Sequence, residues 1–246
     1  MCTILLAWRC VAGADIVLAA NRDELVARAS APPGLLTESS RIAGGRDLIA
    51  GGTWLAVAAD GRVCAVTNRR TLPAGEVRRD PDRRSRGEIP LAVLTDVNEA
   101  QLDEFFFGLG PGLYNPVNVL YASGRVAVVA HIDDERTPRV AHLAPGPHVL
   151  TVRDLDDASR AKDAKLQTEL DAARDASSNA DDLELRLRVV LAGHASPTDD
   201  PLDATCIHGD VYGTVSASTV VAADGGIRYR HAPGRPCVTP FDQVVF

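Results

Sequence analysis

The sequence predicts an α+β or layered α/β protein, in which two sheets pack together and carry helix pairs on their outer faces. Three observations lead to this prediction: strand hairpins alternate with helix pairs, turn dipeptides separate the strands, and the clearest helix is amphipathic. A chain of 246 residues can bury a sizeable core. No linker and no internal repeat interrupts the pattern, so we expect one domain over residues 1–246.

Turn residues delimit the expected strands. Gly13-Ala14 separates the first two, and Asp60-Gly61 is a strong hairpin turn between a later pair. We expect residues 31–40 to form a loop because they include Pro32 and Pro33. The expected strands are residues 3–9, 15–20, 53–59, 62–67, 117–121, 125–131, 139–143, 148–152, 206–208, 214–222 and 227–231.

Periodic apolar residues predict the helices. An Ala/Leu face recurs among charged residues over 157–176, as in a helix that buries one side. Asp181 or Asp182 is expected to cap the next helix, which runs to about residue 192 and ends at Gly193. Residues 89–94 and 99–107 form the remaining expected helical region.

Composition excludes several classes of function. The net charge is −7, with 26 basic and 33 acidic residues, so a general nucleic-acid binder is not expected. No apolar run is long enough for a membrane-spanning helix. The apolar stretch over residues 3–8 stops at Arg9, which is too short for a signal peptide.

The cysteines favour a reducing compartment. They number five, an odd count, and no two are spaced as C-x-x-C. We therefore expect no disulfide framework, no structural metal site and no bound cofactor, and a cytoplasmic location.

Cys2 is the first candidate for chemistry. Methionine aminopeptidase removes Met1 when the second residue is small, and the mature chain would then begin with Cys2. A thiol and an α-amine would share one residue, and an α-amine with a pKa near 8 can act as a base at neutral pH. On its own, however, a Met-Cys start is also consistent with chance.

A second polar cluster follows the expected strand over residues 15–20. Asn21-Arg22-Asp23-Glu24 would lie at the sheet end where the strand from Cys2 begins. A carboxylate there can hold an α-ammonium group, and an arginine can lower a thiol pKa or bind an anionic group. The alternative is an ordinary polar turn with a surface ion pair, but such a turn does not explain four strongly polar residues directly after a buried strand.

Cys206 and His208 form a weaker candidate. If they lie on a strand, both side chains face the same side and could form a metal pair or a Cys-His dyad. Because no third ligand is near in the sequence, we favour a core cysteine beside a hydrogen-bonded histidine.

Several motifs together resemble the NRDE family, which is the family of the transport and Golgi organisation protein. Tyr212-Gly213-Thr214, with Ser216 and Ser218, extends the resemblance over most of the chain. The N-terminal motifs are Met1-Cys2-Thr3, Asn21-Arg22-Asp23-Glu24, Gly51-Gly52-Thr53-Trp54-Leu55 and Thr67-Asn68-Arg69. The resemblance implies a four-layer αββα sandwich of the N-terminal nucleophile hydrolase type.

The resemblance also implies roles for individual residues. Cys2 would be the nucleophile with its own amine as base, Asp23 its partner, and Asn68 an oxyanion donor. Arg22 would pair with Asp23 or with the substrate. The other motif positions would bind a small-molecule substrate: Asn21, Thr53, Trp54, Tyr212, Thr214 and Ser216.

Two positions depart from the family pattern. Many relatives carry Asn where this chain has Val152, and Arg where it has Val215. Losing an oxyanion donor typically slows hydrolysis by about 100-fold to 1,000-fold, although Thr151, Thr214, Ser216 or a backbone amide could substitute. Because the family is linked to haem and acyl-lipid metabolites, a non-catalytic carrier of haem or an acyl lipid on the same fold is the alternative to a hydrolase.

Overall fold

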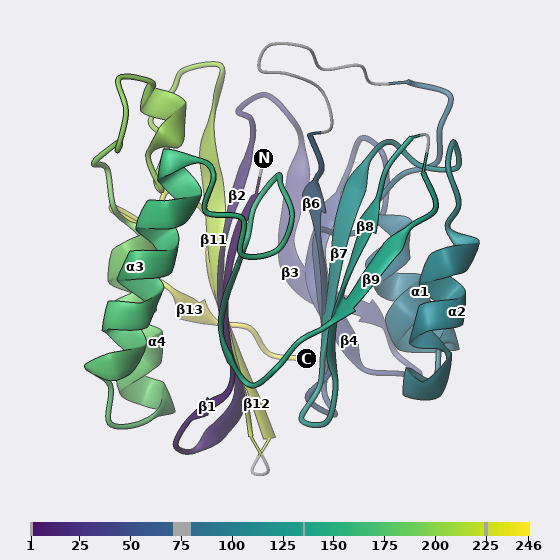
Figure 1. Cartoon of the computed structure of the whole chain (residues 1–246), viewed down its shortest axis with the longest axis horizontal. Helices are drawn as coiled ribbons and strands as arrows, with labels where there is room; N and C mark the ends of the chain where they lie inside the picture. Colours follow the sequence, from purple (N-terminus) through teal and green to yellow (C-terminus); the bar gives the residue numbers. More distant parts are fainter. Residues whose placement is uncertain (1, 71–79, 135, 224–225) are drawn as a thin grey trace. The chain divides into compact units, whose positions relative to one another are not determined.

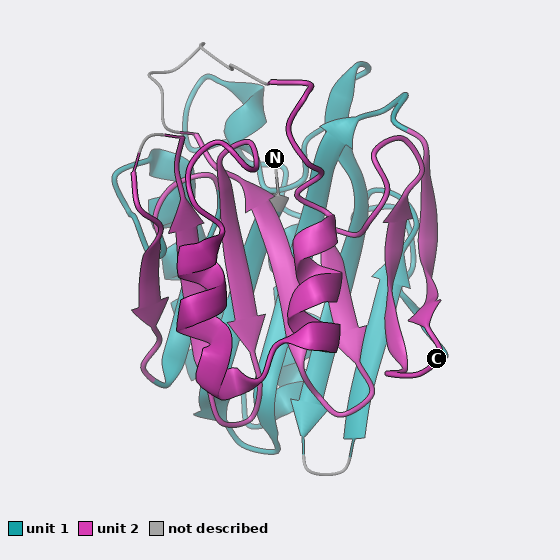
Figure 2. Cartoon of the chain, turned by 90° about the vertical axis from the view of Figure 1, so that its right-hand side faces the viewer, with its two compact units in different colours: residues 1–28, 145–151, 155–245 teal, residues 29–144, 152–154, 246 magenta. Residues whose placement is uncertain are grey.

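Two antiparallel sheets organise the chain, each with a pair of helices (Figure 1). The computed structural model describes residues 2–70, 80–134, 136–223 and 226–246. These residues divide into two compact units, coloured separately in Figure 2. Unit 1 comprises residues up to 28, 145–151 and 155–245, and unit 2 comprises residues 29–144, 152–154 and 246.

Unit 1 contains a six-stranded sheet in the order β10-β1-β2-β11-β12-β13. Two helices, α3 (Ala161–Asp175) and α4 (Ala180–Leu191), pack on one face: α3 lies against β10 and β1, and α4 lies against β2 and β11. The strands are β1 (Cys2–Val11), β2 (Ala14–Leu25), β10 (Gly146–Leu150), β11 (Tyr212–Ala223), β12 (Gly226–Ala232) and β13 (Asp242–Gln243).

Alternation along β1 and β2 builds the core of unit 1. Leu5, Val17 and Ala19 are fully buried and pack against the apolar stripes of α3 and α4. Leu166 and Leu187 are typical of those stripes. This alternation fixes which residues of β2 face the helices: the odd-numbered ones, a set that continues into Asn21 and Asp23.

Unit 2 contains a seven-stranded sheet in the order β3-β4-β5-β6-β7-β8-β9, with α1 (Glu88–Asp96) and α2 (Leu102–Gly108). Phe106 of α2 and Ile89 of α1 are buried with Val119 and Tyr121 of the sheet. The strands are β3 (Ser30–Thr37), β4 (Ile42–Asp47), β5 (Leu55–Ala58), β6 (Val63–Asn68), β7 (Val117–Ala122), β8 (Ala127–Ile132) and β9 (Arg139–His142). Short 3-10 turns cover Glu99–Gln101 in this unit and Pro201–Asp203 in unit 1.

The expected loop at residues 31–40 is wrong, because most of it is strand β3. Pro32 and Pro33 are tolerated there since β3 is the edge strand of its sheet and, among the described residues, pairs only with β4. An edge strand does not need every backbone N–H for a ladder, so proline costs little. Proline disfavours only strands that are paired on both sides, and the place of a strand in its sheet is not visible in the local sequence.

Two further expectations differ from the structure. Residues 206–208, which we expected to form a strand with Cys206 and His208 on the same face, are not a strand. The α4 cap is Asn179, whose side chain accepts a hydrogen bond from the Asp182 N–H, rather than either aspartate. Among the described residues, no helix is both long and apolar enough to cross a membrane.

Candidate functional site

The first strand begins at Cys2, directly opposite the polar tetrad of β2. In the antiparallel ladder, Cys2 pairs with Arg22 and Thr3 pairs with Asn21. The sequence predicted that the tetrad follows the strand, but the tetrad lies inside it. Strand β2 continues to Leu25 because β11 pairs with it on the other side. The expected proximity of Cys2 to the tetrad is therefore confirmed at the level of the backbone.

Asp23 is the most enclosed carboxylate of this region. It is 1% exposed and lies on the helix-facing side of the sheet. The Thr214 hydroxyl donates to Asp23 Oδ1 over 2.6 Å, and the Tyr212 hydroxyl donates to the Asp23 carbonyl over 3.1 Å. A bulge in β11 between Thr214 and Ser216 leaves Val215 as the extra residue, which brings Thr214 opposite Asp23.

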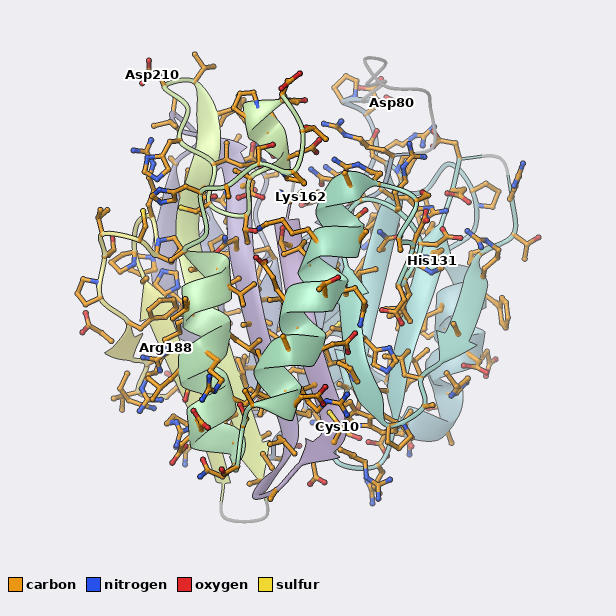
Figure 3. The ribbon with its side chains drawn as sticks, turned by 60° about the vertical axis from the view of Figure 1, so that its left-hand side comes forward. Cys10, Asp80, His131, Lys162, Arg188 and Asp210 are labelled. Carbon is orange, nitrogen blue, oxygen red and sulfur yellow. The ribbon has the colours of Figure 1, made fainter. Side chains whose placement is uncertain are left out.

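A buried lysine that sequence reasoning missed lies near enough to this carboxylate to influence its charge. Lys162 lies in the first turn of α3 and is only 1% exposed (Figure 3). Within the described part of the chain, its Nζ has no hydrogen-bond partner. One signal could have found it: of 26 basic residues only Lys162 and Lys165 are lysines, so an arginine-rich chain retains lysine here.

Burial and charge oppose each other in this pair. Burial raises the pKa of Asp23, while the Lys162 charge and the Thr214 hydrogen bond pull that pKa down. Burial lowers the pKa of Lys162, and Asp23 raises it most among the charged neighbours. Among the charged neighbours, each group is the one that most favours the charged form of the other.

Asp163, the next residue of α3, extends the buried polar cluster. Thr151 donates to its Oδ1 over 2.9 Å, and burial raises the pKa of Asp163. Thr151 precedes Val152, one of the two departures from the family pattern. The Thr151 hydroxyl proton is thus already used in a hydrogen bond to Asp163.

Arg22 lies on the other face of β2. It is 5% exposed and pairs in register with Cys2 on one side and with Ser216, also buried, on the other. Such a guanidinium can bind an anionic group or stabilise a thiolate. Arg22 and Asp23 are adjacent in sequence, but strand alternation directs them to opposite faces.

Asn21 has a structural use. Its side-chain amide donates to the carbonyls of Leu191 and Thr205, both over 2.9 Å. These bonds tie β2 to the end of α4 and to the segment before β11. Both amide hydrogens are engaged, so a substrate contact by Asn21 would have to use its oxygen.

Three predicted site residues belong to unit 2. Asn68 is half-buried at the end of β6 and pairs with Val117. Thr53 is buried, and its hydroxyl donates to the Leu55 carbonyl over 2.9 Å. The Trp54 ring packs over Gly45, where a Cβ would meet it. The structure thus gathers Cys2, Arg22, Asp23, Tyr212, Thr214 and Ser216 in unit 1, and Asn68, Thr53 and Trp54 in unit 2.

A polar network beside Asn68 was not anticipated. Arg69 forms ion pairs with Asp133 and, over 2.6 Å, with Asp154. His131 Nδ1 lies 2.8 Å from Asn118 Oδ1, and burial together with the Arg69 charge lowers the pKa of His131 to about 4. The motif that contains Asn68 is therefore anchored by its neighbour, and His131 is neutral at physiological pH.

Cys206 and His208 do acquire further neighbours of the metal-ligand type. Cys206 is buried, as expected, but His208 is exposed. His194 and Cys237 join them from distant parts of unit 1. Sequence reasoning missed this cluster because its members are up to 43 positions apart, between His194 and Cys237.

Comparison with known proteins identifies the family. The family model described as Transport and Golgi organisation 2 matches residues 1–229. The chain belongs to the Transport and Golgi organisation 2 family. The mouse Transport and Golgi organization 2 homolog is 31% identical over 142 residues, which are 55% of this chain and 50% of the mouse protein. The match to that curated relative thus spans about half of its length.

Solved structures share the fold of this Transport and Golgi organisation 2 family member. The Caenorhabditis elegans ortholog of N-acylethanolamine-hydrolyzing acid amidase has a TM-score of 0.57 at 12% identity, over 89% of this chain and 92% of that one. Penicillin V acylase from Agrobacterium tumefaciens also has a TM-score of 0.57, at 9% identity over 94% and 82% of the two chains. These likenesses confirm the predicted α+β fold of the N-terminal nucleophile hydrolase type.

Proposed function

We propose that this protein is an N-terminal-cysteine hydrolase that cleaves a linear amide or a related acyl bond. The observation that carries the proposal is the β1–β2 register, which sets the start of the chain at Cys2 opposite Arg22 and next to the buried Asp23. An N-terminal nucleophile needs this combination: a chain end fixed on a sheet and a buried counter-charge beside it.

The reaction requires Met1 to be removed first. The Cys2 Sγ attacks the acyl carbon while its α-amine takes the thiol proton, and the C–N bond of the tetrahedral intermediate breaks. The α-ammonium returns the proton to the leaving amine, and an acyl thioester remains on Cys2. Water then attacks the thioester while the α-amine takes a proton from that water. The C–S bond breaks, the α-ammonium returns the proton to the Cys2 sulfur, and the carboxylic acid leaves with the free thiol regenerated on the chain.

Asp23 and Lys162 supply the electrostatics of the proposed site. The carboxylate orients the α-amino group and stabilises the ammonium form that appears during the attack. Lys162 favours the ionised form of Asp23, because its charge opposes the effect of desolvation on the Asp23 pKa. The Thr214 hydrogen bond of 2.6 Å holds the carboxylate in one orientation. In this mechanism Arg22 binds an anionic part of the substrate or lowers the thiol pKa.

Asn68 is proposed as the oxyanion donor, through its side-chain amide at the end of β6. The residues proposed to contact the substrate are Thr53, Trp54, Tyr212, Thr214 and Ser216. Val152 and Val215 carry no side-chain donor, and the Thr151 and Thr214 hydroxyls already donate to Asp163 and Asp23, so Ser216 or a backbone amide would complete the oxyanion site. We expect a slow hydrolase for that reason.

The similar structures suggest the substrate class. Their names describe a hydrolase of N-acylethanolamines, an acylase of penicillin V and, from Clostridium perfringens, a hydrolase of conjugated bile acids. Each of these substrates joins an acyl group to an amine. We therefore propose an N-acylated amine for this chain. We also place it in the cytoplasm, because the described cysteines are free thiols.

The test begins with the N-terminus. Intact mass spectrometry should show a chain that has lost Met1. Alkylation at varied pH should then modify Cys2 with a thiol pKa below the free value of about 8.5. Asp23→Asn should slow this alkylation and turnover of an N-acyl amide panel together, Cys2→Ala should abolish both, and Cys10→Ala is the matched control. Retention of Met1, or a Cys2 no more reactive than Cys10, would rule out the mechanism.

A carrier of haem or an acyl lipid is the second candidate. Val152 and Val215 favour it, since both replace polar groups that hydrolysis uses and a carrier does not need. A haem carrier should give a saturable Soret band on titration with haemin, and one defined ligand substitution should abolish it. Binding that does not saturate would reject the hypothesis of a haem carrier. The same titration with a fluorescent fatty acyl probe tests the hypothesis of an acyl-lipid carrier.

A further inference from the structure

Four side chains with metal-ligand atoms meet at one end of unit 1. They come from three separate segments: the loop after α4, the loop before β11 and the segment after β12. Their ligand atoms all lie within 4.8 Å of one another. The four residues are His194, Cys206, His208 and Cys237.

The distances match the edges of a tetrahedral zinc site. Zinc lies about 2.3 Å from sulfur and about 2.0 Å from nitrogen, so a tetrahedron places two sulfurs about 3.8 Å apart and sulfur about 3.5 Å from nitrogen. The sulfurs of Cys206 and Cys237 are 3.7 Å apart. His208 Nε2 lies 3.2 Å from the Cys237 sulfur. The rings of His194 and His208 are also neighbours, with centroids 4.5 Å apart.

The backbone around the cluster is held independently of any ligand. The Cys206 N–H donates to the Gly193 carbonyl over 2.8 Å, which joins the first two segments next to their ligands. The Asn21 amide reinforces that junction through its bonds to Leu191 and Thr205. Arg235 donates to the Gly209 carbonyl over 3.2 Å and thereby connects the segment after β12 to the loop before β11. A preformed arrangement lowers the entropic cost of binding a metal ion.

A disulfide or simple core packing would account for only part of the cluster. A disulfide between the two cysteines would need a sulfur separation of about 2.0 Å, and it would leave two histidines without a role. Burial in a core would account for Cys206, but His194 and His208 are exposed. Core packing therefore does not explain why two exposed imidazoles lie beside two adjacent thiols.

We propose that His194, Cys206, His208 and Cys237 bind one zinc ion as a closed, structural site. Two thiolates and two neutral imidazoles balance the charge of Zn²⁺, and their softness excludes Mg²⁺ and Ca²⁺. Four protein ligands leave no open position for catalysis.

The ion would stabilise the proposed reaction site indirectly. Ile207 lies between two of the ligands, and its N–H donates to the Thr214 hydroxyl over 2.9 Å. That hydroxyl in turn donates to Asp23. Fixing residues 206–208 thus fixes the orientation of Thr214.

The experiment uses the full chain, purified under reducing conditions without chelators or a histidine tag. Elemental analysis should find about one zinc per chain. X-ray absorption on the unmodified protein should give two sulfur and two nitrogen neighbours, and Co²⁺ exchange should give the strong visible bands of a tetrahedral thiolate site. His194→Ala and His208→Ala replace exposed residues, so they should fold, and each should weaken Co²⁺ affinity by at least about 100-fold.

Cys10→Ser and His142→Ala lie outside the cluster and are the matched controls, so they should keep full affinity. Three results would each overturn the proposal: no saturable Zn²⁺ or Co²⁺ binding, equal affinity in the ligand and control variants, or a Cys206–Cys237 disulfide in the protein as isolated. The last would identify the two cysteines as a redox pair. Cys2 alkylation provides a separate readout, so failure here leaves the hydrolase test intact.

Discussion

Replacing Lys162 by methionine tests whether the buried lysine sustains the charge on Asp23. Methionine fills a similar volume at this 1% exposed position, so the change removes charge rather than packing. Lys162 Nζ makes no hydrogen bond to Asp23 and acts on it through charge alone, so the cost should lie below the about 3–5 kcal/mol of breaking a buried ion pair. Thr214 still hydrogen-bonds Asp23 in the variant, so we expect about 2 kcal/mol near neutral pH.

The pH dependence follows from the sign of the Asp23 shift. Burial raises the pKa of Asp23 in the folded protein, so above the ordinary carboxyl pKa of about 4 the folded chain binds more protons than the unfolded one. Stability contributed by this group therefore falls as pH rises through the window up to its folded pKa. Removing Lys162 raises that pKa further. The loss in the variant should be larger near pH 8 than near pH 5.

Urea unfolding followed by circular dichroism measures both effects. A loss of about 2 kcal/mol should lower the midpoint by about 0.7 M. Lys165→Met is the matched control, since Lys165 lies on the same helix and forms only an i,i+4 ion pair with Glu169, worth about 0.5 kcal/mol. Adding Asp23→Asn to Lys162→Met should recover more than half of the loss. Equal costs for the two lysines, or a loss independent of pH, would refute the coupling of Lys162 to Asp23.

Three further predictions concern the framework of the two units. Glu184→Gln should destabilise the protein by about 2–3 kcal/mol in urea, because it weakens a buried carboxylate that Thr219 and three arginines hydrogen-bond. Burial alone would raise the pKa of Glu184, but these bonds lower it to about 2, so its stabilising contribution should persist down to pH 4 and disappear only as pH falls toward 2. Asn21→Leu should cost about 2–4 kcal/mol, since two buried carbonyls lose their donor, and hydrogen exchange at the end of α4 should accelerate. Gly45→Ala should cost about 1–3 kcal/mol and shift the fluorescence of Trp54, because a Cβ there would overlap the indole ring.

Matched changes separate these effects from general damage. Glu169→Gln removes a partly exposed carboxylate on α3 and should cost under about 0.5 kcal/mol. Gly34→Ala adds a Cβ where nothing lies within 4 Å, so it should be nearly neutral. A Glu184 variant as stable as the Glu169 variant, unchanged exchange in the Asn21 variant, or a Gly45 variant that matches Gly34 would each contradict its prediction.

Local patterns in the sequence predicted most of the helices and strands, and its motifs predicted the family. The Ala/Leu stripe over 157–176 predicted α3, and the Asp60-Gly61 turn predicted the hairpin of β5 and β6, because periodicity and turn chemistry act between near neighbours. The Met-Cys start and the Asn-Arg-Asp-Glu tetrad predicted the family to which the family model assigns the chain. The assigned roles of Cys2, Arg22, Asp23 and Asn68 stay predictions.

The surroundings of those residues depend on contacts between segments that are distant in the sequence. Proline-containing β3 is a strand because it lies at a sheet edge, and the tetrad lies within β2 because β11 pairs beyond it. Lys162 of α3 and Asp23 of β2 influence each other's charge although they are more than 130 positions apart in the sequence. The ligand cluster likewise gathers residues from three loops. Burial, charge pairing and ligand geometry depend on which distant segments the sheet and its helices bring together, and no local pattern encodes those contacts.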